Sequence, residues 1–379
     1  MGTRAANAPI VLAAGGTGGH IFPAEALASE LVARGRRVAL VTDHRGQSFG
    51  ERVPGVATHR IRAGRFDAGV FGKVVGAAEL ILGTAQAALK LRGLAPAAVV
   101  GFGGYPSVPT VLAAARLGIP SLIHEQNALL GRANRFLAPR VRRIALSFAA
   151  TDGLGPAERA RASETGNPVR PAIAAQRERA YAAPTPDGAI ALVVTGGSQG
   201  ARVLSEIVPA ALARLPAALR ARLRLSQQAR PEDIDAVRAL YAANGVAAEL
   251  ASFFGDVPAR LAGAQLVIAR AGASTVAELA AIGRPALLIP YPHAADDHQS
   301  ANARAFAAAG AGWTMAQSDF TADALAGFLA ATLTAPDRLA QAAAAARALG
   351  RPLAARNLAD LTLAMIGANG DHAATEDAA

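Results

Sequence analysis

A glycine-rich segment, GGTGGH at residues 15–20, stands between a short aliphatic run and a helical pattern. At a strand-to-helix turn, glycines let backbone N–H groups approach a phosphate, and the helix N-terminus favours negative charge. The same positive helix end disfavours an imidazolium, so we expect His20 to be a neutral ring that can accept a proton near neutral pH. The segment therefore predicts an anion-binding loop beside a candidate general base. A histidine that only caps or packs against the loop is the alternative.

The glycine spacing does not fit a dinucleotide-binding fingerprint. G-x-G-x-x-G read from Gly16 places its third glycine on Ile21, and the second glycine loop, GFGGYP at residues 101–106, places it on Pro106. No P-loop lysine follows either loop. These features argue against a dehydrogenase and against a phosphate-hydrolysing enzyme, although Asp43 ends the second expected strand.

A second candidate anion site, ASTVAE at residues 273–278, follows an aliphatic run and opens a helical pattern. Thr275 and Glu278 have the spacing of a capping box, which would give them a purely structural role. The amides of the same helix end could instead bind an anion, while the Glu278 carboxylate accepts hydrogen bonds from two ribose hydroxyls. On these residues alone both interpretations stay open.

Two further polar clusters end predicted strands or loops. HEQN at residues 124–127 closes a strand with four polar side chains, which is more typical of a ligand-facing strand end than of a core, and a surface loop is the alternative. Asp296, Asp297 and His298 suggest a metal site, but no D-x-D spacing or second histidine at helical spacing accompanies them. We expect a solvated loop there and no metal.

Short aliphatic runs alternate with helical patterns in both halves of the chain, which predicts an α/β fold with two doubly wound parallel sheets. In the first half we expect helices at 23–34, with Pro23 in the first turn, and at 107–116, and strands at 10–14, 38–42, 97–100, 121–124 and 143–146. The second half opens again with a strand at 190–195 and a glycine loop at 196–200. Strands then follow at 223–226, 266–269 and 286–289, and helices at 231–244, 274–282 and 300–309.

The composition favours an ordered two-domain protein. The 379 residues exceed what one compact core usually supports, and 52% hydrophobic against 17% charged residues argues against disorder. The absence of cysteine excludes disulfides, thiolate metal sites and cysteine nucleophiles. A formal charge of +10 indicates attraction to an anionic ligand or surface, although the arginine-rich composition can also reflect the genome. With 4% aromatic residues there is no stacking platform for single-stranded nucleic acid.

No run of 18 apolar residues is present, so we expect no transmembrane helix, and residues 10–14 are too short for a signal-peptide core. Residues 73–93 are largely apolar, with Glu79, Gln86 and Lys90 on a narrow polar stripe, and we expect mainly a buried helix that covers a sheet. The alternative is an interfacial patch whose cations attract anionic lipid: Lys73, Lys90, Arg92, Arg140, Arg142 and Arg143.

Together these segments resemble the MurG family of bacterial peptidoglycan glycosyltransferases, the UDP-N-acetylglucosamine:N-acetylmuramyl-(pentapeptide) pyrophosphoryl-undecaprenol N-acetylglucosamine transferases. The resemblance rests on the ordered motifs at 15–20, 103–105, 124–127, 166–170, 196–201, 273–278 and 297–303. It implies a GT-B fold, in which two Rossmann-like domains face each other across a cleft. The implied organisation is an acceptor and membrane-side domain at 1–166, a linker at 167–189, a UDP-N-acetylglucosamine domain at 190–345, a helix at 346–366 that returns to the first domain, and a flexible tail at 367–379.

The resemblance implies an inverting transfer of N-acetylglucosamine from UDP-N-acetylglucosamine to the 4-hydroxyl of undecaprenyl-diphosphate-linked muramyl-pentapeptide. The enzyme would be a peripheral protein at the cytoplasmic face of the inner membrane, with an anionic membrane surface as a partner and no nucleic acid. It would act in peptidoglycan synthesis, and hence in cell shape and division, without a metal or another cofactor. A UDP-sugar epimerase, a diacylglycerol glycosyltransferase and a non-catalytic UDP-binding module are the alternatives.

Carried over position by position, the resemblance implies a general base, His20, and two sets of contacts. The donor contacts would be Thr17, Gly18, Gly19, Asn127, Arg170, Ser198, Phe254, Ala273, Ser274, Thr275, Val276, Ala277, Glu278 and Gln299. Arg170 and Ser198 would meet the diphosphate, Glu278 the ribose and Gln299 the sugar. At the Phe254 position the family often has an aliphatic residue that contacts uracil through its backbone. The acceptor contacts would be Gly15, Gly16, Gly103, Gly104, Tyr105 and Glu125.

Overall fold

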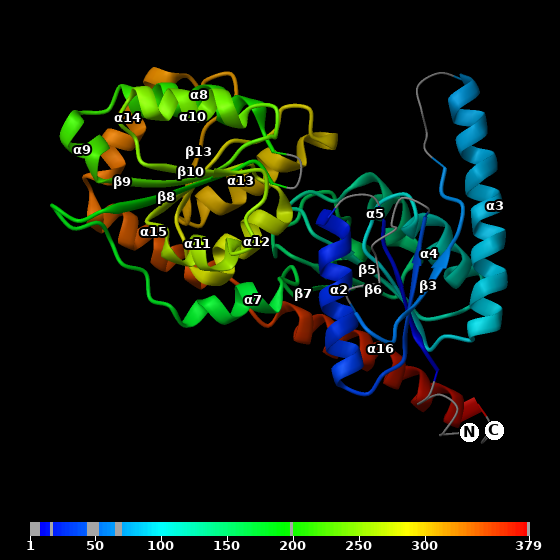
Figure 1. The fold of residues 1–379 in the computed structure, drawn as a ribbon. Helices are drawn as coiled ribbons and strands as arrows, with labels where there is room; N and C mark the ends of the chain where they lie inside the picture. The colour runs from blue at the N-terminus through cyan, green and yellow to red at the C-terminus, as the bar shows by residue number, and fades with distance from the viewer. Residues whose placement is uncertain (1–7, 16–17, 44–52, 65–69, 198–199, 377–379) are drawn as a thin grey trace. The chain divides into compact units, whose positions relative to one another are not determined.

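The computed structural model describes residues 8–15, 18–43, 53–64, 70–197 and 200–376, without the side chains of 70–74 and 368–376 (Figure 1). The chain divides into two compact units. The first comprises Met1–Arg170 and Leu353–Ala379, and the second Pro171–Pro352. Each unit is built on a parallel sheet with helices, as the alternation of aliphatic runs and helical patterns predicts.

The sheet of the first unit has the strand order β3-β2-β1-β4-β5-β6-β7, with every neighbouring pair parallel. Its strands are β1 (Ile10–Ala13), β2 (Val38–Thr42), β3 (Ala57–Arg60), β4 (Ala98–Gly101), β5 (Ser121–Glu125), β6 (Arg143–Leu146) and β7 (Ala162–Glu164). The order reverses between β1 and β4, and doubly wound sheets bind ligands beyond the carboxyl ends of their strands at such a switch point. The first-half glycine loops both start there.

Helices cover both faces of this sheet, because alternate residues of each buried strand point to opposite cores. On one face α2 (Gly18–Ala33) and α16 (Ala354–Glu376) pack with Ile10 and Leu12. On the other, α3 (Val70–Leu94), α4 (Ser107–Arg116) and α5 (Arg132–Leu137) share a core with Val11. Shorter elements of this unit are η1 (Ala138–Arg140) and α6 (Pro156–Arg159).

The first helix starts earlier than expected. α2 begins at Gly18, so Pro23 lies inside the helix and not in its first turn. The proline has no N–H to donate to the carbonyl of Gly19, four residues before it, and the helix continues without that bond. The end of the helix, at Ala33, lies within one residue of the expected bound, and Gly35 follows it with φ 70°. The early start places His20 within the first turn of α2.

α16 packs against α2, which it crosses at an angle in Figure 1, and is joined to it by an ion-pair cluster. Arg34 is 2.7 Å from Glu30 through Nε and 2.5 Å from Asp360 through Nη1. The helix extends to Glu376, beyond residue 366, where the resemblance ends it. It starts only at Ala354, because α15 (Pro336–Leu349) is a separate helix of the second unit.

The sheet of the second unit has the order β10-β9-β8-β11-β12-β13, again with parallel pairs. Its strands are β8 (Ile190–Thr195), β9 (Leu223–Gln228), β10 (Ala248–Ala251), β11 (Leu266–Ala269), β12 (Ala286–Leu288) and β13 (Gly312–Thr314). The order reverses between β8 and β11. The loop at 196–200 and the segment at 273–278 follow these two strands, so both candidate donor segments start at the switch point.

One face of this sheet shares a core with α8 (Arg202–Ala213), α10 (Ile234–Ala243) and α14 (Ala322–Leu333). A second group of helices packs together, namely α11 (Val257–Gly263), α12 (Ala273–Ile282) and α15. Buried Arg284 donates to the carbonyls of Ala262 and Ile282, which satisfies the C-terminal ends of α11 and α12. The remaining elements are α7 (Pro171–Ala174), η2 (Ala175–Glu178), α9 (Ala217–Arg222), η3 (Ala295–Asp297) and α13 (His298–Ala308).

The expectation that the apolar helix at 73–93 is buried over the sheet is wrong for one of its faces. α3 packs against α4, and α4 packs against the strands. Gln86, on the expected polar stripe, accepts a hydrogen bond from the Arg62 amide at 2.9 Å and so faces the protein. The buried side of the helix carries Gly83, Ala87 and Leu91. Away from it, apolar side chains are exposed: Val75 (43%), Ile81 (70%), Leu82 (50%) and Leu89 (67%).

Candidate functional site

The glycine loops of the first unit meet at its switch point. A Cβ on Gly15, after β1, would stand 2.4 Å from Cγ of Pro106, and a Cβ on Gly104, after β4, would stand 3.0 Å from the Gly15 carbonyl oxygen. Gly103 and Gly104 have φ of 82° and 73°, which favours glycine. The structure therefore brings three of the predicted acceptor contacts together. Gly16 and Thr17 lie outside the described residues.

The ring of His20 stands against the second of these loops. A Cβ on Gly103 would be 3.3 Å from its Cε1 atom, and a Cβ on Gly104 would be 3.4 Å from Cδ2. On its other side, His20 Nδ1 is 3.1 Å from Oε1 of Gln126. Gly18 and Gly19 precede it in the first turn of α2, where the helix end disfavours a charged imidazole. His20 is thus held on several sides at the place where an anionic ligand is expected.

The segment HEQN is buried in its first three residues, so the surface-loop alternative is wrong for them. His124 Nε2 is 3.0 Å from the carbonyl oxygen of Gly166, and its ring lies 5.6 Å from the Phe102 ring. Burial lowers the pKa of His124 to about 4, against the opposing effect of the Gly166 bond and with a smaller contribution from His20. His124 is therefore a neutral part of the first-unit site.

This pKa predicts an acid-sensitive first unit. An unfolded histidine titrates near 6.5 and the folded one near 4, so the unfolded state binds more protons between these values. The free energy of unfolding is thus unaffected above about pH 7 and falls by about 3 kcal/mol as the pH is lowered to 4. Urea titrations at several pH values, with hydrogen exchange of the β5 amides as the readout, would measure this loss in the free energy of unfolding. The His124→Gln variant is the control for carboxylates, and equal losses in both proteins would contradict the prediction.

Glu125 organises the loop after β5. Its Oε1 accepts from the backbone N and the Nδ2 of Asn127, both at 3.0 Å, and its Oε2 accepts from Gly131 N at 3.0 Å and Asn134 Nδ2 at 2.8 Å. Asn134 Nδ2 also donates to the His124 carbonyl at 3.1 Å. The sequence analysis missed Asn134, which is a single asparagine in a short helix and belongs to no motif. Tyr105, on the neighbouring loop, is 43% exposed.

The N-terminus of α12 is uncapped by side chains. Its N-cap residue is Gly272, and the helix starts at Ala273, so Thr275 lies inside the first turn and the expected capping box is wrong. Ser274 Oγ is buried and has no hydrogen-bond partner among the described residues. No acidic side chain occupies the first turn. The amides of the first turn and the Ser274 hydroxyl are donors, and no carboxylate in that turn competes for them. Such donors suit the oxygens of a phosphate.

The loop after β8 requires glycine at several positions. A Cβ on Gly196 would stand 2.3 Å from the Ala201 amide nitrogen, and Gly197 and Gly200 have φ of 78° and 69°. The Gly197 amide donates to Oγ1 of Thr195 at 3.3 Å. Because β8 pairs with β11, this tight turn lies beside the strand that leads into α12. Ser198 lies outside the described residues.

Polar side chains join the strand ends of the second unit, and one of them, Arg270, was not recognised from the sequence. Arg270, directly after β11, donates through Nη1 to the carbonyls of Ile289 and Pro290, both at 3.1 Å, and burial lowers its pKa. Asn302 Nδ2 donates to the Ala271 carbonyl at 3.0 Å. Predicted contact Gln299 accepts from the Tyr291 amide at 3.0 Å. An arginine that ends a buried strand was the signal available in the sequence.

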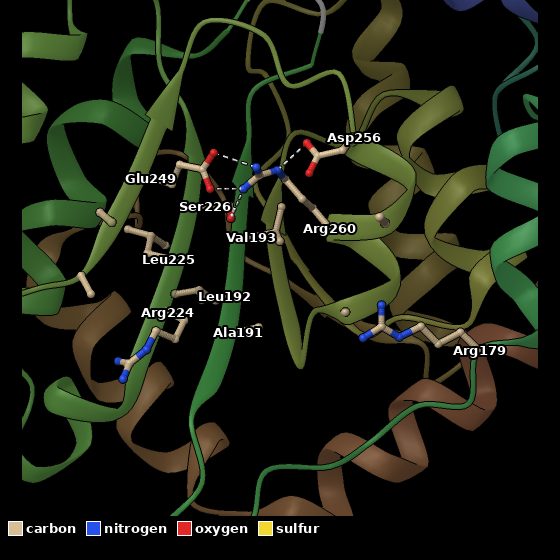
Figure 2. Close-up of a pocket in the computed structure, with 14 residues that line it drawn as sticks. Arg179, Ala191, Leu192, Val193, Arg224, Leu225, Ser226, Glu249, Asp256 and Arg260 are labelled. Carbon is tan, nitrogen blue, oxygen red and sulfur yellow. Dashed lines mark hydrogen bonds and ion pairs between the residues drawn. The ribbon is translucent and has the colours of Figure 1, made fainter.

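Phe254 follows β10, and its ring centroid lies 4.1 Å from the Arg260 guanidinium. Figure 2 shows Arg260 at a hollow of about 700 Å³ over β8, β9 and β10, where it pairs with Glu249 at 2.6 Å and Asp256 at 2.7 Å. These carboxylates raise the pKa of Arg260. None of the predicted donor contacts lines the hollow. Arg260 thus packs against the ring of Phe254 while it is ion-paired with Glu249 and Asp256.

Arg170, the last residue of the first unit's main segment, has its guanidinium 5.9 Å from the ring centroid of Phe22 on α2.

Asp296 and Asp297 adopt left-handed backbone angles, with φ of 53° and 55°, just before α13. Within the described ranges, no three His, Asp or Glu side chains gather to hold a metal ion. Among the residues that the structure describes, no helix is both long and apolar enough to cross a membrane.

Family models match both halves of the chain. Residues 10–146 match the glycosyltransferase family 28 N-terminal domain, and residues 191–358 match its C-terminal domain. A protein of Rhodospirillum centenum is 61% identical over 360 residues, 95% of each chain, and is named UDP-N-acetylglucosamine–N-acetylmuramyl-(pentapeptide) pyrophosphoryl-undecaprenol N-acetylglucosamine transferase.

Solved structures show the same relationship. The crystal structure of Acinetobacter baumannii MurG superposes with a TM-score of 0.78 at 31% identity, covering 94% of this chain and 99% of that one. A UDP-N-acetylglucosamine 2-epimerase from Neisseria meningitidis, with a TM-score of 0.64 over 94% and 99% of the two chains, is 11% identical and shares the fold alone. The chain belongs to glycosyltransferase family 28 and, within it, to the MurG family.

Proposed function

We propose that the chain transfers N-acetylglucosamine from UDP-N-acetylglucosamine to the 4-hydroxyl of undecaprenyl-diphosphate-linked N-acetylmuramyl-pentapeptide, with inversion at the anomeric carbon. The observation that carries the proposal is the 61% identity, over 95% of both chains, to a relative named for this transfer. The two switch-point sites give this reaction a place for each substrate's phosphates. The step belongs to peptidoglycan synthesis, and through it to cell shape and division.

His20 is the proposed general base. It removes the proton of the acceptor 4-hydroxyl while that oxygen attacks the anomeric carbon and the bond from that carbon to the UDP oxygen breaks. The proton ends on the imidazole and the negative charge on UDP. The glycine loops at Gly15, Gly16, Gly103 and Gly104, with Tyr105, receive the acceptor. Glu125, whose oxygens already bond four donors, is proposed to support the acceptor site by holding the 127–134 loop.

The donor is proposed to bind mainly on the second unit. Amides of α12 and the hydroxyl of Ser274 bind phosphate oxygens, Glu278 binds the ribose, Gln299 binds the sugar, and the Phe254 backbone meets uracil. Ser198 and Arg170 contact the diphosphate. The other proposed donor contacts are Thr17, Gly18, Gly19, Asn127, Ala273, Thr275, Val276 and Ala277. Because helix amides and a guanidinium stabilise the leaving UDP, the proposed mechanism uses no metal or other cofactor.

A transfer assay with matched acceptors tests the function. Purified protein with labelled UDP-N-acetylglucosamine should form a labelled disaccharide on a lipid-linked muramyl-pentapeptide analogue. Diacylglycerol in place of this acceptor should give no product, and the donor alone should not epimerise. Labelled glycolipid from diacylglycerol or an epimerised donor would each establish the corresponding rival, and UDP binding without any transfer would leave only a binding module.

We also propose that the exposed face of α3 binds an anionic membrane at its cytoplasmic side, where the lipid-linked acceptor is anchored. Support comes from the run of exposed apolar side chains Ile81, Leu82 and Leu89, with exposed Arg92 on the same helix. Apolar groups that enter the lipid interface next to cations bind through both burial and charge. Arg140, Arg142 and Arg143 are exposed in the same unit, whereas the Lys73 side chain lies outside the described residues.

Replacing Ile81 and Leu89 together with glutamate should weaken binding to phosphatidylglycerol vesicles. Two exposed apolar side chains are lost from the interface and two like charges are added, so the partition coefficient should fall by about 100-fold. Vesicle co-sedimentation measures it. Leu240→Glu on α10, which replaces a side chain of 45% exposure, is the matched control and should bind as wild type. Unaltered sedimentation of the double variant would refute the surface.

A further inference from the structure

Four groups of the first unit form a chain of polar contacts behind the candidate base. It runs from His20 Nδ1 to Gln126 Oε1 at 3.1 Å, from Gln126 Nε2 to His124 Nδ1 at 3.0 Å, and from His124 Nε2 to the Gly166 carbonyl at 3.0 Å. Gln126 and His124 are almost fully buried. Groups in such surroundings have few alternative partners, so each contact constrains where the protons lie.

The orientation of the Gln126 amide follows from its neighbours. Its Nε2 atom is 3.0 Å from the carbonyl oxygens of both Phe102 and His124. Carbonyl oxygens only accept hydrogen bonds, so the atom between them has to be the NH2 group, and a flipped amide would place oxygen against two oxygens. The amide oxygen therefore faces His20.

The protons of His124 fit the same orientation. The Gly166 carbonyl requires a donor, which places the proton of His124 on Nε2. The buried ring is neutral, so Nδ1 carries a lone pair and accepts from the Gln126 NH2 group. A reversed ring protonation would set N–H against N–H at Gln126 and two lone pairs against each other at Gly166.

We propose that Gln126 is a positioning residue that holds neutral His20 with its proton on Nδ1, so that Nε2 carries the lone pair that accepts the proton of the acceptor hydroxyl. An amide oxygen accepts and cannot donate, so the nitrogen that faces it has to be N–H. In water the Nε2–H form of histidine predominates, so the protein selects the less common tautomer. That Nε2 accepts the proton of the acceptor hydroxyl rests on the proposed function, whereas the tautomer of His20 does not.

Nitrogen NMR of the full chain with ¹⁵N-labelled histidine tests the tautomer without any assay of activity. Long-range correlations to the ring protons distinguish protonated from unprotonated nitrogen, and His20→Gln and His124→Gln assign two of the seven histidines. At pH 8 we expect a proton on Nδ1 of His20 and on Nε2 of His124. A proton on Nε2 of His20 in the wild-type protein overturns the proposal, and this result needs no variant of Gln126.

Two substitutions then test whether Gln126 is the cause. Gln126→Leu removes the acceptor, and His20 should move to the Nε2–H form, with kcat reduced at least about tenfold and the dissociation constant for UDP unchanged. Gln126→Met, a side chain of similar length that also lacks the acceptor oxygen, should shift the tautomer in the same way. An unshifted His20 in the leucine variant overturns the positioning role. A shifted tautomer with wild-type kcat supports the positioning role and overturns His20 as the base.

Discussion

Replacing His20 with alanine is expected to lower kcat by about 10²- to 10⁴-fold, the usual contribution of a general base, while the dissociation constant for UDP-N-acetylglucosamine stays within about twofold. The imidazole lies against the Gly103–Gly104 loop and Gln126, and the proposed donor contacts of ribose, sugar and uracil lie in the second unit. Loss of the ring therefore removes proton transfer and leaves most donor binding in place. Steady-state kinetics with a saturating acceptor analogue, together with calorimetric titration of the donor, separates the two effects.

His59→Ala is the matched control for this experiment. It removes a histidine from β3, at the edge of the same sheet, and should leave kcat near the wild-type value. If His20→Ala turns over like the control, His20 is not the base. If it loses donor affinity in proportion to turnover, the ring serves binding and the proposed chemistry is wrong.

Replacing Glu278 with alanine is expected to weaken UDP binding by about 10- to 150-fold, which corresponds to the roughly 1.5–3 kcal/mol of hydrogen bonds to a charged group. With no acidic side chain in the first turn of α12, phosphate oxygens can occupy the helix end while Glu278, one turn further on, binds the ribose. The loss should therefore depend on the ribose hydroxyls and not on the phosphates.

Calorimetric titration with UDP and with 2′-deoxy-UDP separates these contributions. The wild-type protein should bind the deoxy nucleotide more weakly, and Glu278→Ala should bind both nucleotides with nearly equal affinity. Glu206→Gln, an exposed carboxylate of α8 paired with Arg202 at 2.6 Å, is the control and should discriminate as wild type. A Glu278 variant that keeps the wild-type preference for UDP would show that this carboxylate does not contact the 2′-hydroxyl.

The central strands were predictable because a parallel strand buried on both faces appears as a continuous aliphatic run. IVLA of β1 and LVIA of β11 are fully buried, and the bounds of β11 were predicted to the residue. The edge strand β3 has the sequence ATHR and is largely exposed, so no aliphatic run marks it. Strand order, and with it the position of the two switch points, depends on pairing between distant segments and was not predicted.

Errors arose where local patterns do not reveal which neighbour a residue meets. The spacing of Thr275 and Glu278 satisfied a capping box, but the N-cap residue of α12 is Gly272, three residues before Thr275. In α3 the buried side includes Gly83, whose missing side chain leaves room for the Arg62 carbonyl. Several larger apolar side chains, Ile81, Leu82 and Leu89 among them, lie on the exposed side. A pattern of large apolar residues does not reveal an interface that is formed by glycine.

The sequence identified the candidate base and the polar strand end, but not the residues that hold them in place. His20 and the HEQN segment were recognised from glycine spacing and from polar residues at a strand end. Gln126 was part of that segment, but its role depends on contacts with Phe102, His124 and His20, which are as many as 106 positions away in sequence. Arg270 likewise donates to carbonyls that directly follow β12. Such contacts require the folded chain.

The most direct test of the account is the structure of the product formed from UDP-N-acetylglucosamine and a lipid-linked muramyl-pentapeptide analogue. Proton NMR of the isolated disaccharide reports both the position and the configuration of the new bond. We expect a β linkage from the anomeric carbon of N-acetylglucosamine to the 4-oxygen of the muramyl residue, because a single displacement inverts the α configuration of the donor. An α linkage, or attachment at another hydroxyl, would contradict it.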